Sequence, residues 1–278
     1  MDLIRKINSL NKLLFTNKIT KPVKMGNKLL LLATAPCVSD FFEYASVREQ
    51  FKDYDLAFIN YMIYYSQKEV FLYKPKYFIL IDSIFYDDNF FKDKSINPEK
   101  QKVVGILEKI DWECYVVTTV FADFGLKNKN VHFIRLSCFS SQYGKGTMKM
   151  FRKNLLNPGI FNVVQGALYF GITFGYEQIA ILGCTYKNLH MYMDVDGLHI
   201  LEHRHYYDLE AKEIVISNEE LDRRKTGYIE NLDKRAAISS RILWDLKKYA
   251  ADRNVEVINY SEGSMIDSIK MGRLIKEK

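Results

Sequence analysis

The chain has 278 residues, of which 48% are hydrophobic and 14% aromatic, and its formal net charge is +6. This length and apolar content suit one large α/β domain with a sizeable core. No apolar run approaches the roughly 18–20 residues that a membrane-spanning helix needs. The modest positive charge fits an anionic partner such as a nucleotide, an anionic lipid or an acidic glycan. We expect no nucleic-acid partner, because the sequence has no arginine-rich stripe and no RNA-binding motif.

The cysteines and the first residues predict the compartment. Four cysteines lie far apart and form no CxxC pair: Cys37, Cys114, Cys138 and Cys184. This pattern predicts free thiols in a reducing compartment rather than a disulfide framework or a zinc site. Residues 1–20 lack the apolar core and the small-residue cleavage site of a signal peptide. We therefore expect a cytoplasmic protein.

Residues 1–24 are a basic amphipathic segment, and residues 25–278 are expected to form a single α/β domain. Apolar residues recur at nearly helical spacing in residues 2–15, and the segment holds six lysines and arginines. Two interpretations stay open. The helix can lie on the inner face of the cell membrane as a peripheral contact, or it can pack on the domain or on a second subunit of a homo-oligomer.

Short apolar runs, separated mostly by helical patterns, predict the fold of the domain. Six runs bounded by turn residues read as strands, at residues 28–33, 55–60, 76–82, 115–119, 131–135 and 178–182, and a seventh follows at 256–259. Helices are expected at residues 41–51, capped by Ser39 or Asp40, and at 105–110, 162–175, 218–249 and 264–275. This alternation predicts a single Rossmann-like, doubly wound, mainly parallel sheet.

Polar residues follow several of these strands at the point where each ends. Thr34, Asn60 and Asp82 follow the first three strands, and the strand at 178–182 runs into Gly183-Cys184-Thr185-Tyr186. In open parallel sheets, ligands bind beyond the carboxyl ends of the strands. Amide and hydroxyl groups there suit the base and ribose of a nucleotide, while tyrosines and lysines suit its phosphate. The loop after the first strand could hold a phosphate at a helix N-terminus, although GxGxxG and P-loop motifs are absent from it.

A polar loop after Gly183 holds most of the histidines. Four of the five lie within sixteen positions: His190, His199, His203 and His205. One interpretation is an imidazole that takes a proton from an acceptor hydroxyl, for which His205 ranks first because Tyr206, Tyr207 and Asp208 follow it. A second is a metal site in which His203 and His205 join Asp196 or Asp208. A third is a surface hairpin with Asp196-Gly197 as its turn.

Two further residue patterns near this loop carry alternative readings. Asp194-Val195-Asp196 matches the DxD with which many sugar-nucleotide transferases hold a divalent metal, but Gly197 also makes it typical of a turn. Cys184 occupies a position suited to a nucleophile, yet a small buried cysteine is the better interpretation because no acid–base partner is evident.

In the order of its elements the chain resembles the bacterial sialyltransferases of glycosyltransferase family 42 and related polysaccharide-biosynthesis transferases. Thr34-Ala35-Pro36 stands where the family has an Asn-Gly-Pro nucleotide loop, and Asn60 and Asp82 stand at its next two strand ends. The helix from Asn162 to Gly175-Tyr176 resembles the family's helix that ends in Gly-Tyr. The segment from His205 to Asp208 resembles His-Phe-Tyr segments in related transferases.

The resemblance implies a GT-A variant fold and an inverting, metal-independent glycosyltransferase without a cofactor. It implies a nucleotide-activated donor, with a CMP-linked sugar favoured, and a bacterial surface glycan or glycolipid acceptor. His205 would be the catalytic base, and Tyr186 and Tyr192 would assist departure of the phosphate. The implied nucleotide-binding residues are Thr34, Ala35, Pro36, Asn60, Asp82, Asn162, Gly183 and Thr185.

Two other classes of function stay open. One is a metal-dependent transferase or hydrolase that uses Asp194, Asp196 and the histidines. The other is a non-catalytic, nucleotide-binding assembly factor on the membrane face.

Overall fold

The computed structural model describes residues 26–88, 90, 97–185, 191–194, 197–201, 213–217 and 228–277. For residues 191–194, 197–201, 213–216, 228–233 and 235 it describes the backbone alone.

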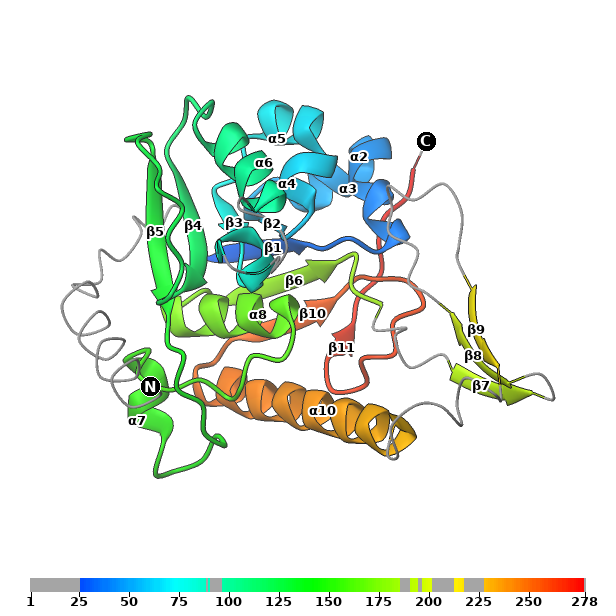
Figure 1. Ribbon diagram of the computed structural model, residues 1–278. Helices are drawn as coiled ribbons and strands as arrows, with labels where there is room; N and C mark the ends of the chain where they lie inside the picture. Colours follow the sequence, from blue (N-terminus) through cyan, green and yellow to red (C-terminus); the bar gives the residue numbers. More distant parts are fainter. Residues whose placement is uncertain are drawn as a thin grey trace.

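An eight-stranded sheet, parallel throughout, organises the described chain (Figure 1). Its strands, in chain order, are β1 (Lys28–Leu32), β2 (Tyr54–Ile59), β3 (Tyr77–Ile79), β4 (Cys114–Thr119), β5 (Val131–Leu136), β6 (Gln178–Leu182), β10 (Glu256–Asn259) and β11 (Lys270–Met271). Their spatial order is β11-β10-β6-β1-β2-β3-β4-β5. This arrangement confirms the predicted Rossmann-like, doubly wound topology, and all seven predicted strands are present. The direction of winding reverses between β1 and β6, the topological switch point.

The helices form layers on the two sides of the sheet, as Figure 1 shows. One layer holds α2 (Ser39–Glu43), α3 (Ala45–Gln50), α4 (Met62–Tyr65), α5 (Gln67–Tyr73) and α6 (Pro98–Leu107), and the other holds α8 (Val163–Phe174) and α10 (Tyr228–Asp252). Shorter elements are α7 (Met148–Arg152) and the 3-10 helices η1 (Pro36–Val38) and η2 (Ser83–Phe85).

The central strand β1 is buried on both faces. Leu29 and Leu31 pack in the core beneath α8 and α10, while Leu30 and Leu32 pack in the core beneath α2 to α6. Alternate side chains of a strand point to opposite faces, so each layer of helices covers its own half of the core. A continuous apolar run is the expected sequence of such a strand.

Local signals define the ends of α8. The Asn162 side chain accepts a hydrogen bond from the Gln165 amide at 3.0 Å, and the Gln165 side chain accepts from the Asn162 amide in return, a complete capping box. At the other end Gly175 adopts φ +86°, the left-handed conformation that ends many helices. The predicted helix at 162–175 is therefore confirmed nearly to the residue.

Several predicted helices were wrong in extent or kind. The pattern at residues 41–51 forms two short helices, because Tyr44 is extended at φ −99° and ψ 122°, and neither Ser39 nor Asp40 caps them. The helix expected at 105–110 begins earlier, at Pro98, behind its cap Asn97. Residues 264–275 are not helical: β11 forms there and pairs in parallel with the end of β10. The last long helix spans Tyr228–Asp252 in the described chain, and residues 218–227 lie outside it.

A small antiparallel sheet forms in the segment after Gly183. It consists of β7 (Met191–Asp194), β8 (Gly197–Leu201) and β9 (Glu213–Ser217), paired in the order β7-β8-β9. The pairing of β7 with β8 confirms the hairpin, one of the three interpretations of this segment. Gly197, expected in the turn, instead begins β8 and pairs with Asp194. The strand β9 was not predicted. In the described part of the chain, no helix combines the length and the apolar character needed to cross a membrane.

Candidate functional site

The loops after β1 and β6 meet at the switch point and are bonded to each other directly. The Ala33 amide donates to the Leu182 carbonyl at 2.8 Å, and the Ala35 amide donates to the Gly183 carbonyl, also at 2.8 Å. Gly183 has φ +85°, and a Cβ atom there would lie 2.5 Å from the Ala33 carbonyl oxygen. Three of the residues predicted to bind a nucleotide, half-buried Thr34 together with Ala35 and Gly183, therefore lie side by side. Only a glycine allows the two loops to approach so closely.

The helices that follow β1 are too short to offer a phosphate a strongly positive N-terminus. Pro36 opens η1, which has only three residues, and proline has no amide hydrogen to donate. The helix that follows, α2, has five residues. Because a helix dipole grows from aligned peptide units, these short turns give a weak positive end.

The loop after β10 covers the residues that follow β6. The Cys184 amide donates to Ser261 Oγ at 2.8 Å, Ser264 Oγ donates to the Cys184 carbonyl at 3.0 Å, and the Met265 amide donates to the Thr185 carbonyl at 2.8 Å. Cys184 and Thr185 are both buried. Burial raises the pKa of the Cys184 thiol to about 12, so it is a thiol and not a thiolate near neutral pH. The interpretation of Cys184 as a small buried cysteine is confirmed.

Asn60 and Asp82, at the ends of β2 and β3, are in direct contact. Asn60 Nδ2 donates a hydrogen bond to Asp82 Oδ2. Asn60 is buried and has φ 48°, a left-handed conformation that few residues other than glycine adopt. Burial raises the pKa of the half-buried Asp82 carboxyl, and the hydrogen bond from Asn60 partly opposes this shift. The structure therefore brings together two of the residues that were predicted from separate strand ends.

A cleft of about 520 Å³ opens beside Asp82. It lies at the carboxyl ends of β3, β4 and β5, and the start of α8 and one face of α10 complete its walls. Its polar lining residues include Asp82, Ser83, Tyr86, Thr119, Ser137, Asn157, Asn162 and Arg241. This cleft lies two strands away from the switch point. At the switch point itself, backbone hydrogen bonds join the loops after β1 and β6.

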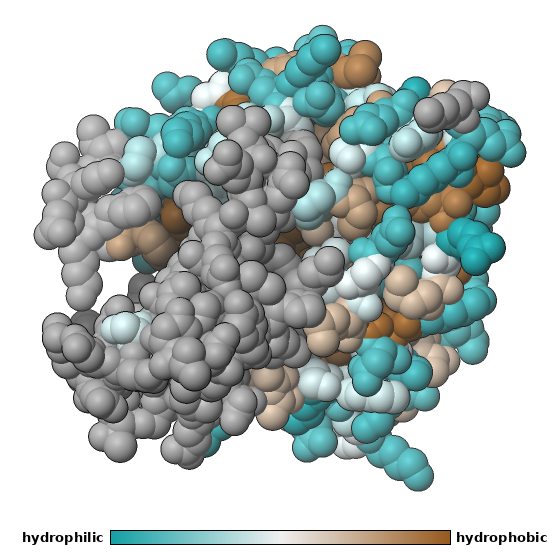
Figure 2. Space-filling model, turned by 90° about the vertical axis from the view of Figure 1, so that its right-hand side faces the viewer, coloured by the Kyte–Doolittle hydropathy of each residue, from teal (hydrophilic) through white to brown (hydrophobic). Residues whose placement is uncertain are grey.

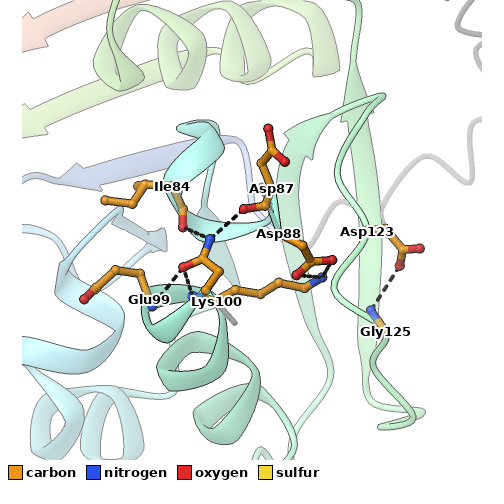
Figure 3. Close-up of polar contacts among 8 residues, drawn as sticks. Ile84, Asp87, Asp88, Glu99, Lys100, Asp123 and Gly125 are labelled. Atoms are coloured by element: carbon orange, nitrogen blue, oxygen red, sulfur yellow. Dashed lines mark hydrogen bonds and ion pairs between the residues drawn. The ribbon is translucent and has the colours of Figure 1, made fainter. Parts of the chain in front are cut away.

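Buried polar contacts fix the wall that carries Asp82. Asn97 Nδ2 donates to the Ile84 and Asp87 carbonyls at 2.7 and 2.8 Å, and Asn97 Oδ1 accepts from the amides of Glu99 and Lys100. Figure 3 shows this set of bonds between the loop after β3 and the start of α6. Because Asn97 ties η2 to a helix, the loop that begins at Asp82 is held in place.

The opposite wall belongs to α8 and α10. Inside it, buried Gln165 donates to Ser239 Oγ at 2.9 Å and to the Ser239 carbonyl at 3.1 Å, which fixes α10 against the start of α8. Arg241 follows on α10 with its side chain 46% exposed, and its guanidinium lies 4.0 Å from the buried Asp245 carboxylate. A half-exposed arginine in a cleft is a natural donor to a phosphate or carboxylate. Exposed Phe161 adds an aromatic surface to the lining.

Sequence reasoning found Asp82 and Asn162 but missed the rest of this cleft. Asn162 lines the cleft and also caps α8. Arg241 gave no signal, since an arginine four residues before an aspartate is a common surface pattern on helices. Tyr86 and Thr119 are linked to each other by a 3.0 Å hydrogen bond between their hydroxyls, and only the pairing of β3 with β4 brings them together.

The remaining predicted residues lie in the segment after Thr185. Tyr186, His190, Asp196, His203, His205 and Asp208 are outside the described residues. Tyr192 is opposite His199 in the pairing of β7 with β8, and Asp194 ends β7. Within the described side chains, no three His, Cys, Asp or Glu residues gather as metal ligands, so the roles predicted for this segment stay predictions.

Fold and cleft together define a Rossmann-like α/β protein with a cleft of mixed polar and apolar lining at the carboxyl edge of its sheet. Comparison with family models, with curated proteins and with solved structures found no match to the chain. The function therefore has to be inferred from the chemistry of the cleft. Figure 2 shows the side of the molecule at the right of Figure 1, where the described surface mixes hydrophilic residues with smaller hydrophobic areas.

Proposed function

We propose that the protein is a glycosyltransferase that moves a sugar from a nucleotide-activated donor to a glycan or glycolipid acceptor of the bacterial surface. The observation that carries this proposal is the cleft at the ends of β3 to β5, with Asp82, Arg241 and several hydroxyls in its lining. Its volume of about 520 Å³ falls within the range of about 300–1,000 Å³ usual for small-molecule sites. The finer proposal is an inverting enzyme with a GT-A variant fold.

The mixed polar and apolar lining of the cleft suits a sugar. Sugars present many hydroxyl groups, which pair with carboxylate, amide and hydroxyl side chains such as Asp82, Asn157 and Thr119. The apolar face of a sugar ring can lie on an aromatic side chain, and Phe161 offers one. Arg241 provides a positive charge for the phosphate of the donor or for a carboxylate on the sugar.

We propose that the nucleotide half of the donor lies next to the cleft, along the ends of β1 and β2. Thr34 and Asn60 follow these two strands, which are adjacent in the sheet, and the contact between Asn60 and Asp82 links that edge to the cleft. A CMP-linked sugar is the favoured donor, because the family that the sequence resembles uses one. Tyr186 and Tyr192 remain predicted to assist departure of the phosphate, and contact of residues 1–24 with a membrane or a second subunit remains a prediction.

Nucleotide binding is the first test. We expect CMP to raise the melting temperature without magnesium and to do so more than UDP, GDP or CDP. At a ligand concentration of 100 times Kd the stabilisation is about 2.7 kcal/mol. Stabilisation that requires magnesium would instead support the metal-dependent alternative. Sugar transfer is then assayed with a panel of activated donors, and nucleotide binding without any transfer would contradict the proposal and support an assembly factor.

Arg241 tests whether the cleft is the site. Arg241→Gln removes a charge from the cleft, and Lys248→Gln removes one from an exposed position on the same helix that does not line it. We expect the first variant to lower kcat/KM for sugar transfer by about tenfold or more, which corresponds to at least about 1.4 kcal/mol, the size of one charge-assisted hydrogen bond. The second should leave it unchanged. Equal effects of the two variants would place the reaction elsewhere.

A further inference from the structure

Asp82 occupies a helix-capping position without acting as a cap. It is the residue immediately before η2, at φ −69° and ψ 133°, and its carboxylate makes no capping hydrogen bond to that helix. Aspartate at this position normally accepts a hydrogen bond from the first helical amides. Here the carboxylate accepts from Asn60 and lines the cleft. A local structural role therefore does not account for an aspartate at this position.

Asn60 holds a left-handed conformation that hydrogen bonds to neighbouring segments maintain. Its amide donates to the Ile79 carbonyl at 2.9 Å, and its own carbonyl accepts from the Ile63 amide at 3.2 Å. These bonds fix the residue at φ 48° with its side chain directed at Asp82. Asn60 is 7% exposed, and its Oδ1 atom has no hydrogen-bond partner among the described residues. Backbone strain and an unsatisfied buried polar atom both cost stability, and such features concentrate at functional sites.

The surroundings of Asp82 raise the proton affinity of its carboxylate. Burial raises the pKa of Asp82 above its ordinary value of 3.8, and the Asn60 hydrogen bond moderates the increase. Tyr61 and Tyr86, which face it from the start of α4 and the end of η2, have raised pKa values, mainly because of burial, and stay neutral. Among the described residues that line the cleft, Arg241 carries the only other charge. A carboxylate with raised proton affinity beside a substrate cleft is a typical general base.

We propose that Asp82 is the catalytic base of the transfer reaction and that Asn60 is the residue that positions it. This inference depends on the proposed glycosyltransferase function and assigns the base to Asp82 in place of His205. The Asp82 carboxylate takes the proton from the acceptor hydroxyl as that oxygen forms a bond to the anomeric carbon of the donor sugar. The bond from this carbon to the phosphate oxygen breaks on the opposite side, and the electron pair leaves with the nucleotide. Asp82 then releases the proton to water.

The first test replaces the carboxylate by an amide of the same shape. Asp82→Asn should lower kcat by about 10²- to 10⁴-fold, the usual contribution of a general base, while Kd for the donor nucleotide changes less than threefold. Asp88→Asn is the matched control, because Asp88 is exposed, pairs with Lys100 and does not line the cleft. Its turnover should equal that of the wild type. A weakened Kd with unchanged kcat for Asp82→Asn would make Asp82 a binding residue and overturn the inference.

The second test uses the pH profile, which a purely structural role would not move. The base must be deprotonated, so kcat falls as pH falls through the pKa of Asp82. Asn60→Gly relieves the left-handed strain but removes the hydrogen bond that lowers this pKa. The acidic limb of kcat, measured at saturating donor, should therefore shift to higher pH whether or not the donor Kd also changes. An unshifted limb in this variant would show that Asn60 does not tune the base.

The outcomes also separate this inference from the proposed function. Absence of transfer by the wild-type protein with every donor would refute the function itself. Transfer by the wild type, with turnover lost in His205→Ala and retained in Asp82→Asn, would keep the function and assign the base to His205. We expect the reverse pattern.

Discussion

Gly183→Ala tests whether the contact between the loops after β1 and β6 depends on a glycine. An alanine Cβ would lie 2.5 Å from the Ala33 carbonyl oxygen, 2.8 Å from its carbonyl carbon and 3.0 Å from Val38 Cβ. Two of these atoms belong to the backbone, so no rotation of a side chain can relieve the overlap. The loops have to separate, and the hydrogen bonds between them, each 2.8 Å long, weaken or break.

The expected cost follows from two contributions. Holding alanine at φ +85° costs about 1–2 kcal/mol relative to a right-handed conformation. Loss of the two backbone hydrogen bonds adds about 1 kcal/mol each, so the free energy of unfolding should fall by about 3–4 kcal/mol. At about 2.1 cal/mol/K per residue, a chain of this length loses about 1.7 °C in melting temperature for each kcal/mol. We therefore expect a decrease of about 5–7 °C.

Thermal and urea denaturation of the purified variants measure this effect. Gly105→Ala is the matched control, because Gly105 is in α6 and nothing lies within 4 Å of its Cβ position. That change should raise stability by about 0.5–1 kcal/mol through helix propensity. A shift of about 1 °C corresponds to only about half a kcal/mol. A Gly183→Ala protein that melts within about 1 °C of the wild type would therefore refute the close packing of the two loops.

Three further predictions follow from buried groups. Asp55 lies 2.9 Å from Lys76 in an ion pair whose side chains are 9% and 10% exposed. Asp55→Asn removes one charge of this pair, so the free energy of unfolding measured with urea should fall by about 3–5 kcal/mol. The control Glu49→Gln, in an exposed pair, should lower it by under about 1 kcal/mol. Burial raises the pKa of Tyr54 to about 12 from 10.0, so the unfolded chain ionises first. The stability that this tyrosine contributes is complete below pH 10.0 and is lost as pH rises toward 12, and Tyr54→Phe should flatten the decline in unfolding free energy over this interval. The Cys184 thiol is buried and its pKa is raised to about 12. It should therefore react with iodoacetamide at about pH 8 only after unfolding, which mass spectrometry of native and urea-treated protein measures. Rapid labelling of Cys184 in the native protein would contradict its burial.

Local sequence patterns predicted the structure correctly where a segment's conformation depends mainly on its own residues. The run of leucines in β1 predicts a strand buried on both faces, and Leu29 to Leu32 are each 0% exposed. Asn162 and Gly175 mark the two ends of α8 because a capping side chain and a left-handed glycine act within a few residues of themselves.

The same patterns failed where a distant segment decides the structure. Residues 264–275 have a pattern that suits a helix, yet the end of β10 offers unpaired backbone groups and Lys270–Met271 pairs with them. Ser264 Oγ, meanwhile, accepts a hydrogen bond from Asn259 and donates one to the Cys184 carbonyl. Propensity is a weak preference that tertiary pairing overrides.

The sequence by itself determined seven strands of the sheet along the chain, the helix α8 and the polar residues that follow the strands, because periodicity and capping are properties of neighbouring residues. The alternation of strands with helical patterns also predicted a parallel sheet. Only the tertiary structure decided which of those polar residues form a site. It brought Asn60 to Asp82 across 22 positions of sequence, placed Arg241 of α10 on the opposite wall of the cleft, and joined the loops at the switch point. Contacts between segments so far apart depend on strand order and register, and no local pattern encodes either.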